Sequence, residues 1–297
     1  MKTRHRLCTT TRMLLACVVA LFVTGCRQSH PLHPDAPHLA PGVTMEDVTF
    51  FSRALQREMP YRVFLPAHLS SRQKLPVVYL LNGRDGNFRD WSNRTDVARY
   101  AAQGLILVMP EGNASYYTNA ALKPQDRYED YLVDDLIANV ESRFPASSGR
   151  ANRALVGVSM GGFAAIKLAL SRPDLFTFVA AFSPAIDVPS RRFTLRRAAQ
   201  SWHFLTIFGP SGSQSRRQSD PFILIQSSDP EKSPYLYLTA GEQESLLEQN
   251  NRFASRLQAR HFSYEFHVTP GGHDWTQWNM QIPACFAALL QHIQPTG

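Results

Sequence analysis

The sequence predicts an α/β fold, in which a mostly parallel central sheet is flanked by helices. The first observation is an alternation, from residue 43 onward, of short apolar β-type runs with stretches of helical periodicity, which is typical of βαβ units. The second is the composition, because 44% hydrophobic and 19% charged residues are ordinary values for a globular protein. We therefore expect one globular domain over residues 43–297.

The first 25 residues have the features of a bacterial signal peptide. Residues 1–12 carry four positive charges and no acid, and Met13 to Val23 form an apolar run that is shorter than the roughly 20 residues that span a bilayer. The run ends in Val23-Thr24-Gly25-Cys26, which resembles the bacterial lipobox, where the cysteine is lipidated with chains such as palmitate and becomes the new N-terminus. The alternative is an ordinary small-residue cleavage site beside an unrelated cysteine.

Residues 26–42 are expected to tether a lipidated Cys26 to the folded domain. Four prolines in this stretch prevent helix or central strand and favour an extended chain. Because Arg27 is not the Asp that retains lipoproteins at the inner membrane, the resemblance implies an outer-membrane protein facing the periplasm. Loss of the four signal-peptide charges lowers the formal charge from +7 to +3, and no nucleic-acid-binding motif is present, so we expect no nucleic-acid partner.

The domain should open with an antiparallel hairpin made by Val43 to Phe51 and Tyr61 to Leu65. Six further apolar runs predict buried strands, at Val77–Leu81, Leu105–Met109, Ala154–Val158, Phe178–Phe182, Tyr235–Thr239 and Tyr264–Val268. The clearest helix spans Tyr128 to Phe144, where an apolar residue recurs every four positions.

Residues 188–219 interrupt this alternation and predict an insertion outside the sheet. The segment contains neither Asp nor Glu but six arginines, at Arg191, Arg192, Arg196, Arg197, Arg216 and Arg217. Two roles remain open for it. It is either a solvated basic surface or a flap beside a pocket, which would favour an anionic substrate or a phosphate-rich surface.

The motif Gly157-Val158-Ser159-Met160-Gly161 lies between a predicted strand and a predicted helix. That context is what a nucleophile elbow requires, because the serine sits on a strained turn that exposes its hydroxyl at the edge of the sheet. The glycines are needed where side chains would collide with neighbouring backbone. The pattern should arise by chance about 0.1 times in a chain of this length. Together with its setting, it indicates a catalytic serine.

A serine hydroxyl is a poor nucleophile until a base takes its proton, so a histidine is expected on a loop after a late strand. His273 follows the last predicted strand and two glycines, and the alternative is a core or surface histidine without a catalytic role. The acid that orients the histidine should follow the preceding strand, where both Glu242 and Glu244 stand. We choose Glu244 and keep Glu242 as the alternative. The order serine, acid, histidine is that of the α/β-hydrolases.

Backbone N–H groups of an oxyanion hole are expected from two places. One is the residue after the nucleophile, Met160, and the other is a loop after an early strand. That loop begins at Asn82-Gly83, and we assign its donor to Arg84.

At these residues the chain resembles the putative esterase family, the esterase D-like α/β-hydrolases that include S-formylglutathione hydrolases, tributyrin, feruloyl and siderophore esterases, and bacterial mycolyltransferases. The likeness covers about residues 45 to 293 through the ordered motifs PVVYLLNG with Asp90-Trp91 after it, MPEGNASYYTN, YEDYLVDDL, GVSMGG and GGHDWTQW. It implies an α/β-hydrolase fold with Ser159, Glu244 and His273 as the triad. It also implies oxyanion donors at Arg84 and Met160.

Three residues depart from the family pattern. Asn82 stands where many members have His, Tyr116 where many have Trp, and Glu244 where Asp is commoner. The first two bear on substrate placement, whereas the longer Glu bears on the identity of the acid.

The expected activity is hydrolysis of a carboxylic ester, with a short-chain acyl group or a sugar, phenolic or lipid alcohol, through a serine ester. No metal or organic cofactor is implied. The alternative is an acyltransferase that uses the same triad with an alcohol in place of water, and a more distant one is a catalytically inactive binding lipoprotein. The export signal argues against the cytosolic glutathione thioester of some relatives.

Replacing the predicted lipidation site, Cys26→Ser, should release the protein from membranes to the soluble fraction with catalysis unchanged. Stable anchoring needs the several acyl chains of a mature lipoprotein, because a single chain binds membranes only marginally. Fractionation of cells expressing each form, with salt-washed membranes and an esterase assay of both fractions, measures this. A serine variant that stays in the washed membranes would show that Cys26 is not the anchor.

Overall fold

A computed structural model describes residues 34–70 and 73–293. The predicted signal peptide, Cys26 and residues 26–33 of the predicted tether lie outside the described residues. Residues 34–42 contain no helix or strand. From Ala36 onward the chain forms one compact unit. Within the described residues, no helix combines the length and apolar character that crossing a membrane requires.

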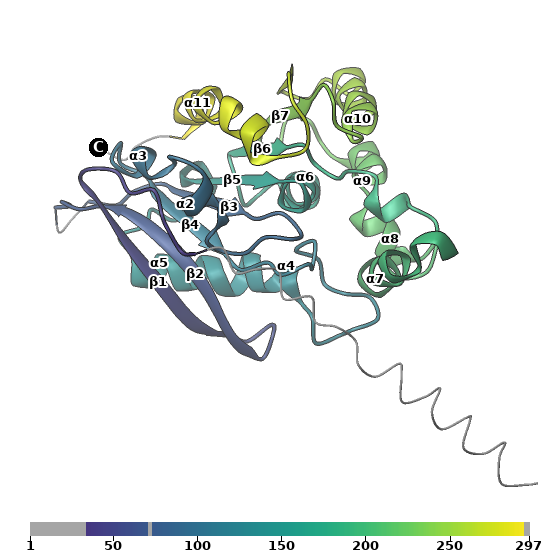
Figure 1. The fold of residues 1–297 in the computed structure, drawn as a ribbon, viewed down its shortest axis with the longest axis horizontal. Coiled ribbons are helices and arrows are strands. Elements are labelled where there is room, and N and C mark those ends of the chain that lie inside the picture. The colour runs from purple at the N-terminus through teal and green to yellow at the C-terminus, as the bar shows by residue number, and fades with distance from the viewer. Residues whose placement is uncertain (1–33, 71–72, 294–297) are drawn as a thin grey trace, which may run out of the picture. The chain divides into compact units, whose positions relative to one another are not determined.

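An eight-stranded sheet forms the centre of this unit (Figure 1). In chain order its strands are β1 (Val43–Ser52), β2 (Arg57–Pro66), β3 (Val77–Leu81), β4 (Ile106–Pro110), β5 (Arg153–Val158), β6 (Phe178–Phe182), β7 (Tyr235–Gly241) and β8 (Tyr264–Thr269). The spatial order is β1-β2-β4-β3-β5-β6-β7-β8, and all pairs are parallel except β1–β2 and β2–β4. The predicted α/β fold and its entry hairpin are confirmed. β2 starts four residues earlier than predicted, because the polar pair Arg57-Glu58 hides its periodicity.

The strand order reverses around β3, and this reversal creates the place for a site. After β3 the chain forms β4, which pairs with one edge of β3, and then crosses to form β5, which pairs with the opposite edge of β3. In open α/β sheets, ligands bind in the crevice at the carboxyl ends of strands where the order reverses. The loop that begins with Asn82 leaves β3 at this edge, and Ser159 leaves β5 at the same edge.

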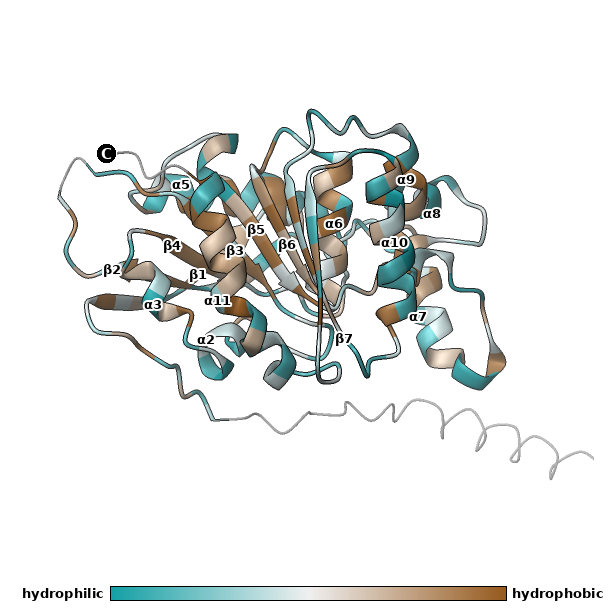
Figure 2. Cartoon of the chain, turned by 90° about the horizontal axis from the view of Figure 1, so that it is seen from above, coloured by the Kyte–Doolittle hydropathy of each residue, from teal (hydrophilic) through white to brown (hydrophobic). Residues whose placement is uncertain are grey.

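Helices cover both faces of the sheet (Figure 1). Each face has its own hydrophobic core. One face packs against α2 (Asp90–Arg94), α3 (Ala98–Ala101) and α11 (Trp275–His292). The other packs against α4 (Tyr128–Asp130), η1 (Tyr131–Leu136), α5 (Ile137–Arg143), α6 (Met160–Ser171), α7 (Ala198–Phe208), α9 (Pro221–Ser227) and α10 (Leu247–Ala259). Successive strand residues point to opposite faces, so Val78 enters the first core and Tyr79 the second. Figure 2 shows the resulting apolar strands between the helices.

The helix predicted over residues 128–144 is found over residues 128–143, but its middle is not α-helical. Residues Tyr131–Leu136 form a π-helical segment between α4 and α5. The predicted apolar stripe repeats every 4 residues, which exceeds the 3.6-residue period of an α-helix. The wider i→i+5 turn keeps the buried Leu132, Leu136 and Val140 facing the sheet.

The predicted insertion lies between β6 and β7, outside the sheet, and contains η3 (Val188–Ser190), η4 (Leu195–Arg197), α7 and α8 (Gln214–Ser219). Its arginines do not form one solvated surface. Arg216 is buried and donates to the backbone oxygens of Gly209, Pro189 and Arg191 at 2.7, 2.7 and 2.9 Å. Arg191 pairs with Asp187 at 2.8 Å. Arg217 donates to Gly212 O, so three of the six arginines hold the insertion itself together.

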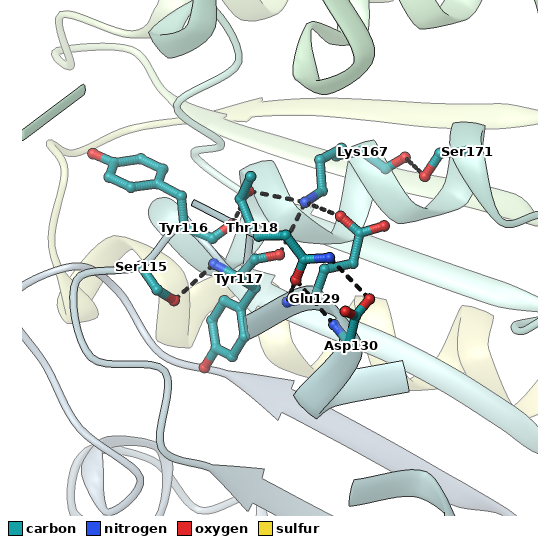
Figure 3. Close-up of polar contacts among 9 residues, drawn as sticks. Ser115, Tyr116, Tyr117, Thr118, Glu129, Asp130, Lys167 and Ser171 are labelled. Atoms are coloured by element: carbon teal, nitrogen blue, oxygen red, sulfur yellow. Dashed lines mark hydrogen bonds and ion pairs between the residues drawn. The ribbon is translucent and has the colours of Figure 1, made fainter. Parts of the chain in front are cut away.

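A buried lysine connects the elbow helix α6 to the loop at 113–118 (Figure 3). Lys167 is 1% exposed, and its ammonium donates to Tyr117 O and Thr118 Oγ1, both at 2.9 Å, and to Glu129 Oε2 at 2.7 Å. These three bonds use all three ammonium protons. The loop that carries Tyr116 is thereby held against the helix that follows Ser159.

Lys167→Met should lower the free energy of unfolding by about 3 kcal/mol, because it leaves a partly buried carboxylate without its cation. That value is at the low end of the range for buried pairs, since the Glu129 side chain is 25% exposed. Urea unfolding at unchanged m-value measures it. Lys232→Met, at an exposed ion pair, is the matched control and should change stability by less than about 0.5 kcal/mol. Adding Glu129→Gln to Lys167→Met should cost little more, and full additivity of the two would contradict the coupling.

Candidate active site

Ser159 occupies a strained turn between β5 and α6. Its backbone angles are φ 54° and ψ −108°, in the left-handed half of the map that side chains disfavour. The turn is held from both sides, because Ser159 N donates to Phe182 O at 2.8 Å and Ser159 O accepts from Phe163 N at 2.9 Å. Strain of this kind persists only where surrounding structure over-determines it. Here the neighbouring strand and the following helix both do so.

The two motif glycines are required by packing around this turn. A Cβ on Gly157 would lie 2.2 Å from the carbonyl carbon of Gly161, and one on Gly161 would lie 2.6 Å from Leu81 O. Both contacts are with backbone, which cannot move aside without displacing α6 or β3. Only glycine at both positions allows the serine to approach the end of β3.

Ser159, His273 and Glu244 form one hydrogen-bonded chain. His273 Nε2 lies 2.8 Å from Ser159 Oγ, and His273 Nδ1 lies 2.9 Å from Glu244 Oε2. A carboxylate accepts only, so Nδ1 carries the proton and Nε2 is left to accept from the serine hydroxyl. The Glu244 side chain is fully buried, whereas the His273 side chain is 34% exposed. The acid is therefore shielded, and the base can be reached by solvent.

The alternative acid, Glu242, does not reach the histidine. Its side chain is exposed and forms no hydrogen bond with any residue that the structure describes. The chain turns after β7, with Glu244 N donating to Gly241 O at 3.3 Å, and the turn buries Glu244. The structure thus brings together the residue chosen from the sequence and leaves its alternative at the surface.

The acid and base loops pack directly on each other. A Cβ on Gly241 would lie 2.5 Å from Gly271 O, and Gln243 N donates to that same oxygen at 3.0 Å. Gly271 itself has φ +116°, which favours glycine. Asp274, the next residue after His273, caps α11 by accepting from the N–H groups of its first turn. The histidine is therefore fixed between a glycine bend and a helix start.

An aromatic contact that the sequence did not reveal also orients the His273 ring. The ring of Trp278 lies edge-to-face against His273 with centroids 5.2 Å apart, and Trp278 Nε1 donates to Ser183 Oγ at 3.0 Å. The only signal in the sequence was the presence of Trp278 in the motif GGHDWTQW.

Two backbone N–H groups beside Ser159 are free to donate. Met160 is the first residue of α6, so its N–H has no helical acceptor. The Arg84 N–H has no acceptor among the described residues, and a Cβ built on the preceding Gly83 would lie only 3.7 Å from Ser159 Cβ. The predicted donors therefore flank the nucleophile.

Asn82 fixes the orientation of the Gly83–Arg84 peptide. Its Nδ2 donates to Gly83 O at 2.9 Å, while its Oδ1 accepts from Tyr117 Oη at 2.6 Å and from Gly112 N at 3.2 Å. Carbonyl and N–H point in opposite directions across a trans peptide, so holding the Gly83 oxygen aims the Arg84 N–H away from it. Asn82, which stands where many family members have histidine, is thus a buried amide that orients the Arg84 N–H.

Tyr116 forms an aromatic wall next to the elbow. Its ring packs edge-on against Phe163, Phe204 and Phe208, with centroids 5.6 to 5.7 Å apart, and its N–H donates to Met160 Sδ at 3.2 Å. Burial raises the pKa of the Tyr116 hydroxyl, and the nearby guanidinium of Arg84 opposes this increase. The contribution of α7 to this wall was not predicted, because nothing local in the sequence links residues 204 and 208 to residue 116.

Comparison with known proteins gives a consistent result. Residues 52–289 match the family described as Putative esterase. The chain is 24% identical over 254 residues to an acetyl esterase of Caldicellulosiruptor saccharolyticus, covering 80% of this chain and 95% of the relative.

Two solved structures share the fold. One is the fluorophosphonate-binding serine hydrolase F of Staphylococcus aureus, with TM-score 0.72, 24% identity and coverage of 82% of this chain and 98% of that one. The other is an S-formylglutathione hydrolase of Agrobacterium tumefaciens, with TM-score 0.75, 20% identity and coverage of 87% and 99%. The chain therefore belongs to the Putative esterase family and is a carboxylic ester hydrolase built on the α/β-hydrolase fold.

Proposed function

We propose that the chain is a carboxylesterase in which Ser159 is the nucleophile, His273 the general base and Glu244 the acid that orients it. The observation that carries the proposal is the unbroken chain of hydrogen bonds from Ser159 Oγ through the imidazole to the buried carboxylate, at 2.8 and 2.9 Å. These are the distances that a nucleophile and its base require. The strained elbow presents the serine hydroxyl to this base.

The reaction proceeds in two halves. His273 Nε2 takes the Ser159 proton as Oγ attacks the ester carbonyl, and the N–H groups of Met160 and Arg84 stabilise the resulting oxyanion. The intermediate collapses as His273 returns the proton to the departing alcohol, leaving an acyl-serine. Water, deprotonated by His273, then attacks the acyl carbonyl and releases the acid and free Ser159. Glu244 holds the imidazole in the required tautomer and stabilises its charged form.

The substrate we propose is a short-chain acyl ester, with a sugar or phenolic alcohol as the leaving group. The acetyl esterase relative supports a small acyl group. Hydrolysis is proposed in preference to acyl transfer because the acetyl esterase relative is a hydrolase. The His273 side chain is 34% exposed, so water can reach the acyl-serine.

The location we propose is that of an exported bacterial lipoprotein, anchored through Cys26 and facing the periplasm from the outer membrane. The sequence of charged residues, apolar run, small residues and cysteine supports it. The tether would then separate the lipid from the esterase domain.

Ser159→Ala and His273→Ala should each lower kcat for nitrophenyl acetate by about 10⁶, leaving a residual enhancement of roughly 10³ to 10⁴ over water. The double variant should lose little more, because the two groups act as one unit. Labelling with a fluorophosphonate probe should occur in the wild type and be absent from Ser159→Ala. Retention of more than a few per cent of activity by Ser159→Ala would refute the serine-ester mechanism.

The acid is tested by two isosteric variants on the same loop. Glu244→Gln should lower kcat by roughly 10⁴, since the imidazole remains but is held in the wrong tautomer. Glu242→Gln is the matched control and should be close to wild type, because that side chain is exposed. Steady-state kinetics with circular dichroism as a folding check measure both. Collapse of the Glu242→Gln variant alone would reassign the acid.

A further inference from the structure

The insertion exposes three large apolar side chains within ten positions. Phe193 is 53% exposed, Leu195 86% and Trp202 63%. Single exposed apolar residues are normal on a protein surface, but contiguous ones mark interaction sites. These three are an aromatic, an aliphatic and an indole side chain, and the exposed fraction of Leu195 is the largest among the exposed apolar residues of the described chain.

Hydrogen bonds in the insertion bring together the two segments of chain that carry these three side chains. Thr194 N donates to Ser201 Oγ at 3.1 Å, and Ser201 Oγ donates back to Thr194 O at 3.2 Å. This pair fixes the segment before η4 beside the first turns of α7. Phe193 and Leu195 flank Thr194, and Trp202 follows Ser201, so all three adjoin the same contact.

The outer side of α7 is separate from its packing side. Phe204, Ile207 and Phe208 are buried and face the core. Trp202 is exposed on the same helix. In Figure 2, apolar and hydrophilic segments lie side by side near α7, on the side that points away from the sheet.

Three arginines surround the exposed apolar residues. The side chains of Arg192, Arg196 and Arg197 are exposed and have no hydrogen-bond or ion-pair partner among the described residues, unlike those of Arg191 and Arg216. No Asp or Glu occurs between residues 188 and 219 to neutralise them. The six residues 192, 193, 195, 196, 197 and 202 therefore form what we call the basic apolar patch.

We propose that the basic apolar patch binds the surface of an anionic lipid bilayer. Arginines near such a surface are attracted by its negative potential, while Trp, Phe and Leu enter the boundary between headgroups and acyl chains. Charge complementarity supplies the long-range attraction, and the three apolar side chains supply the insertion. The inference is independent of the esterase reaction, since none of the six residues belongs to the triad or the oxyanion donors.

The composition of the patch favours a lipid surface over a nucleic acid. A nucleic acid would engage the arginines and stack on the aromatic rings, but it offers little to the aliphatic Leu195. A bilayer accepts all three apolar side chains at once. Binding should be reversible and weakened by salt, because the charges involved are exposed.

Vesicle binding by residues 36–297 tests the proposal without the predicted lipid anchor. This segment holds the whole sheet and both hydrophobic cores, so it is expected to fold alone. It should cosediment with vesicles of equimolar phosphatidylcholine and phosphatidylglycerol, and far less with phosphatidylcholine alone. Binding should shift the tryptophan emission to the blue. That shift should disappear in Trp202→Phe, since Trp91 and Trp278 are buried and the fourth tryptophan, Trp275, is half-buried and packs against both of them.

Matched charge variants separate the patch from net charge. Changing Arg192, Arg196 and Arg197 together to Gln should weaken partitioning into the anionic vesicles by about 100-fold, at roughly fivefold per arginine. The control removes three exposed arginines elsewhere, at Arg53, Arg94 and Arg256, and should lower partitioning by less than about tenfold. Equal losses in the two triple variants would overturn the proposal.

An apolar pair tests insertion with the charges intact. Phe193→Ser with Leu195→Ser should reduce partitioning at least about tenfold. Phe51→Ser, at another phenylalanine that is 53% exposed, should have no effect. All variants should retain hydrolysis of a soluble nitrophenyl ester, which verifies folding. Three outcomes would assign the patch to a different partner and overturn the proposal. They are binding to a single-stranded oligonucleotide in place of vesicles, self-association that the patch variants abolish, and a raised KM of the patch variants for the soluble ester.

Discussion

The strained backbone at Ser159 is the constraint on which the rest of the site depends. Ser159 keeps its φ of 54° because its backbone is hydrogen-bonded on both sides, its N–H to Phe182 O of β6 and its carbonyl to Phe163 N of α6. The close approach of α6 to β5 excludes a side chain at Gly157, and its close approach to β3 excludes one at Gly161. The elbow therefore fixes the Ser159 hydroxyl, the Met160 N–H that we propose as an oxyanion donor, and the distance to the Gly83 loop.

Buried polar groups give this geometry its rigidity. Asn82 holds the Gly83 peptide and receives the Tyr117 hydroxyl, while Lys167 holds Tyr117 and Thr118 from the opposite side. The loop that carries Tyr116 is thus fixed between two buried side chains, one after β3 and one on α6. An oxyanion hole is effective when its donors need no rearrangement during the reaction. These satisfied networks are a physical source of that preorganisation.

The insertion shows how one residue type serves different purposes within a short segment. Arg216 donates hydrogen bonds to three backbone carbonyls, and Arg191 forms an ion pair with Asp187. Both guanidinium groups therefore already have partners within the protein. Arg192, Arg196 and Arg197 remain exposed beside apolar side chains. The same α7 that carries Trp202 outward sends Phe204 and Phe208 inward against Tyr116. Loops and insertions of this kind vary the function of a shared scaffold.

The sequence by itself determined the strands, the entry hairpin and the positions of Ser159 and His273. Apolar periodicity and glycine spacing are local properties, and a short motif reports the turn that its own residues must form. Strand β2 is a partial exception, because its first two residues, Arg57 and Glu58, are polar and exposed. They show no apolar alternation, so the start of the strand could not be predicted.

Only the tertiary structure decided between Glu244 and Glu242, since two carboxylates on one loop differ in nothing local except which of them the turn buries against His273. It also assigned Asn82 to the Gly83 peptide, buried Arg216, and gathered Phe193, Leu195 and Trp202 beside exposed arginines. Each of these depends on contacts between segments distant in the chain or on the path of a loop. Such contacts follow from how the sheet and its insertion pack, and no pattern of neighbouring residues encodes them.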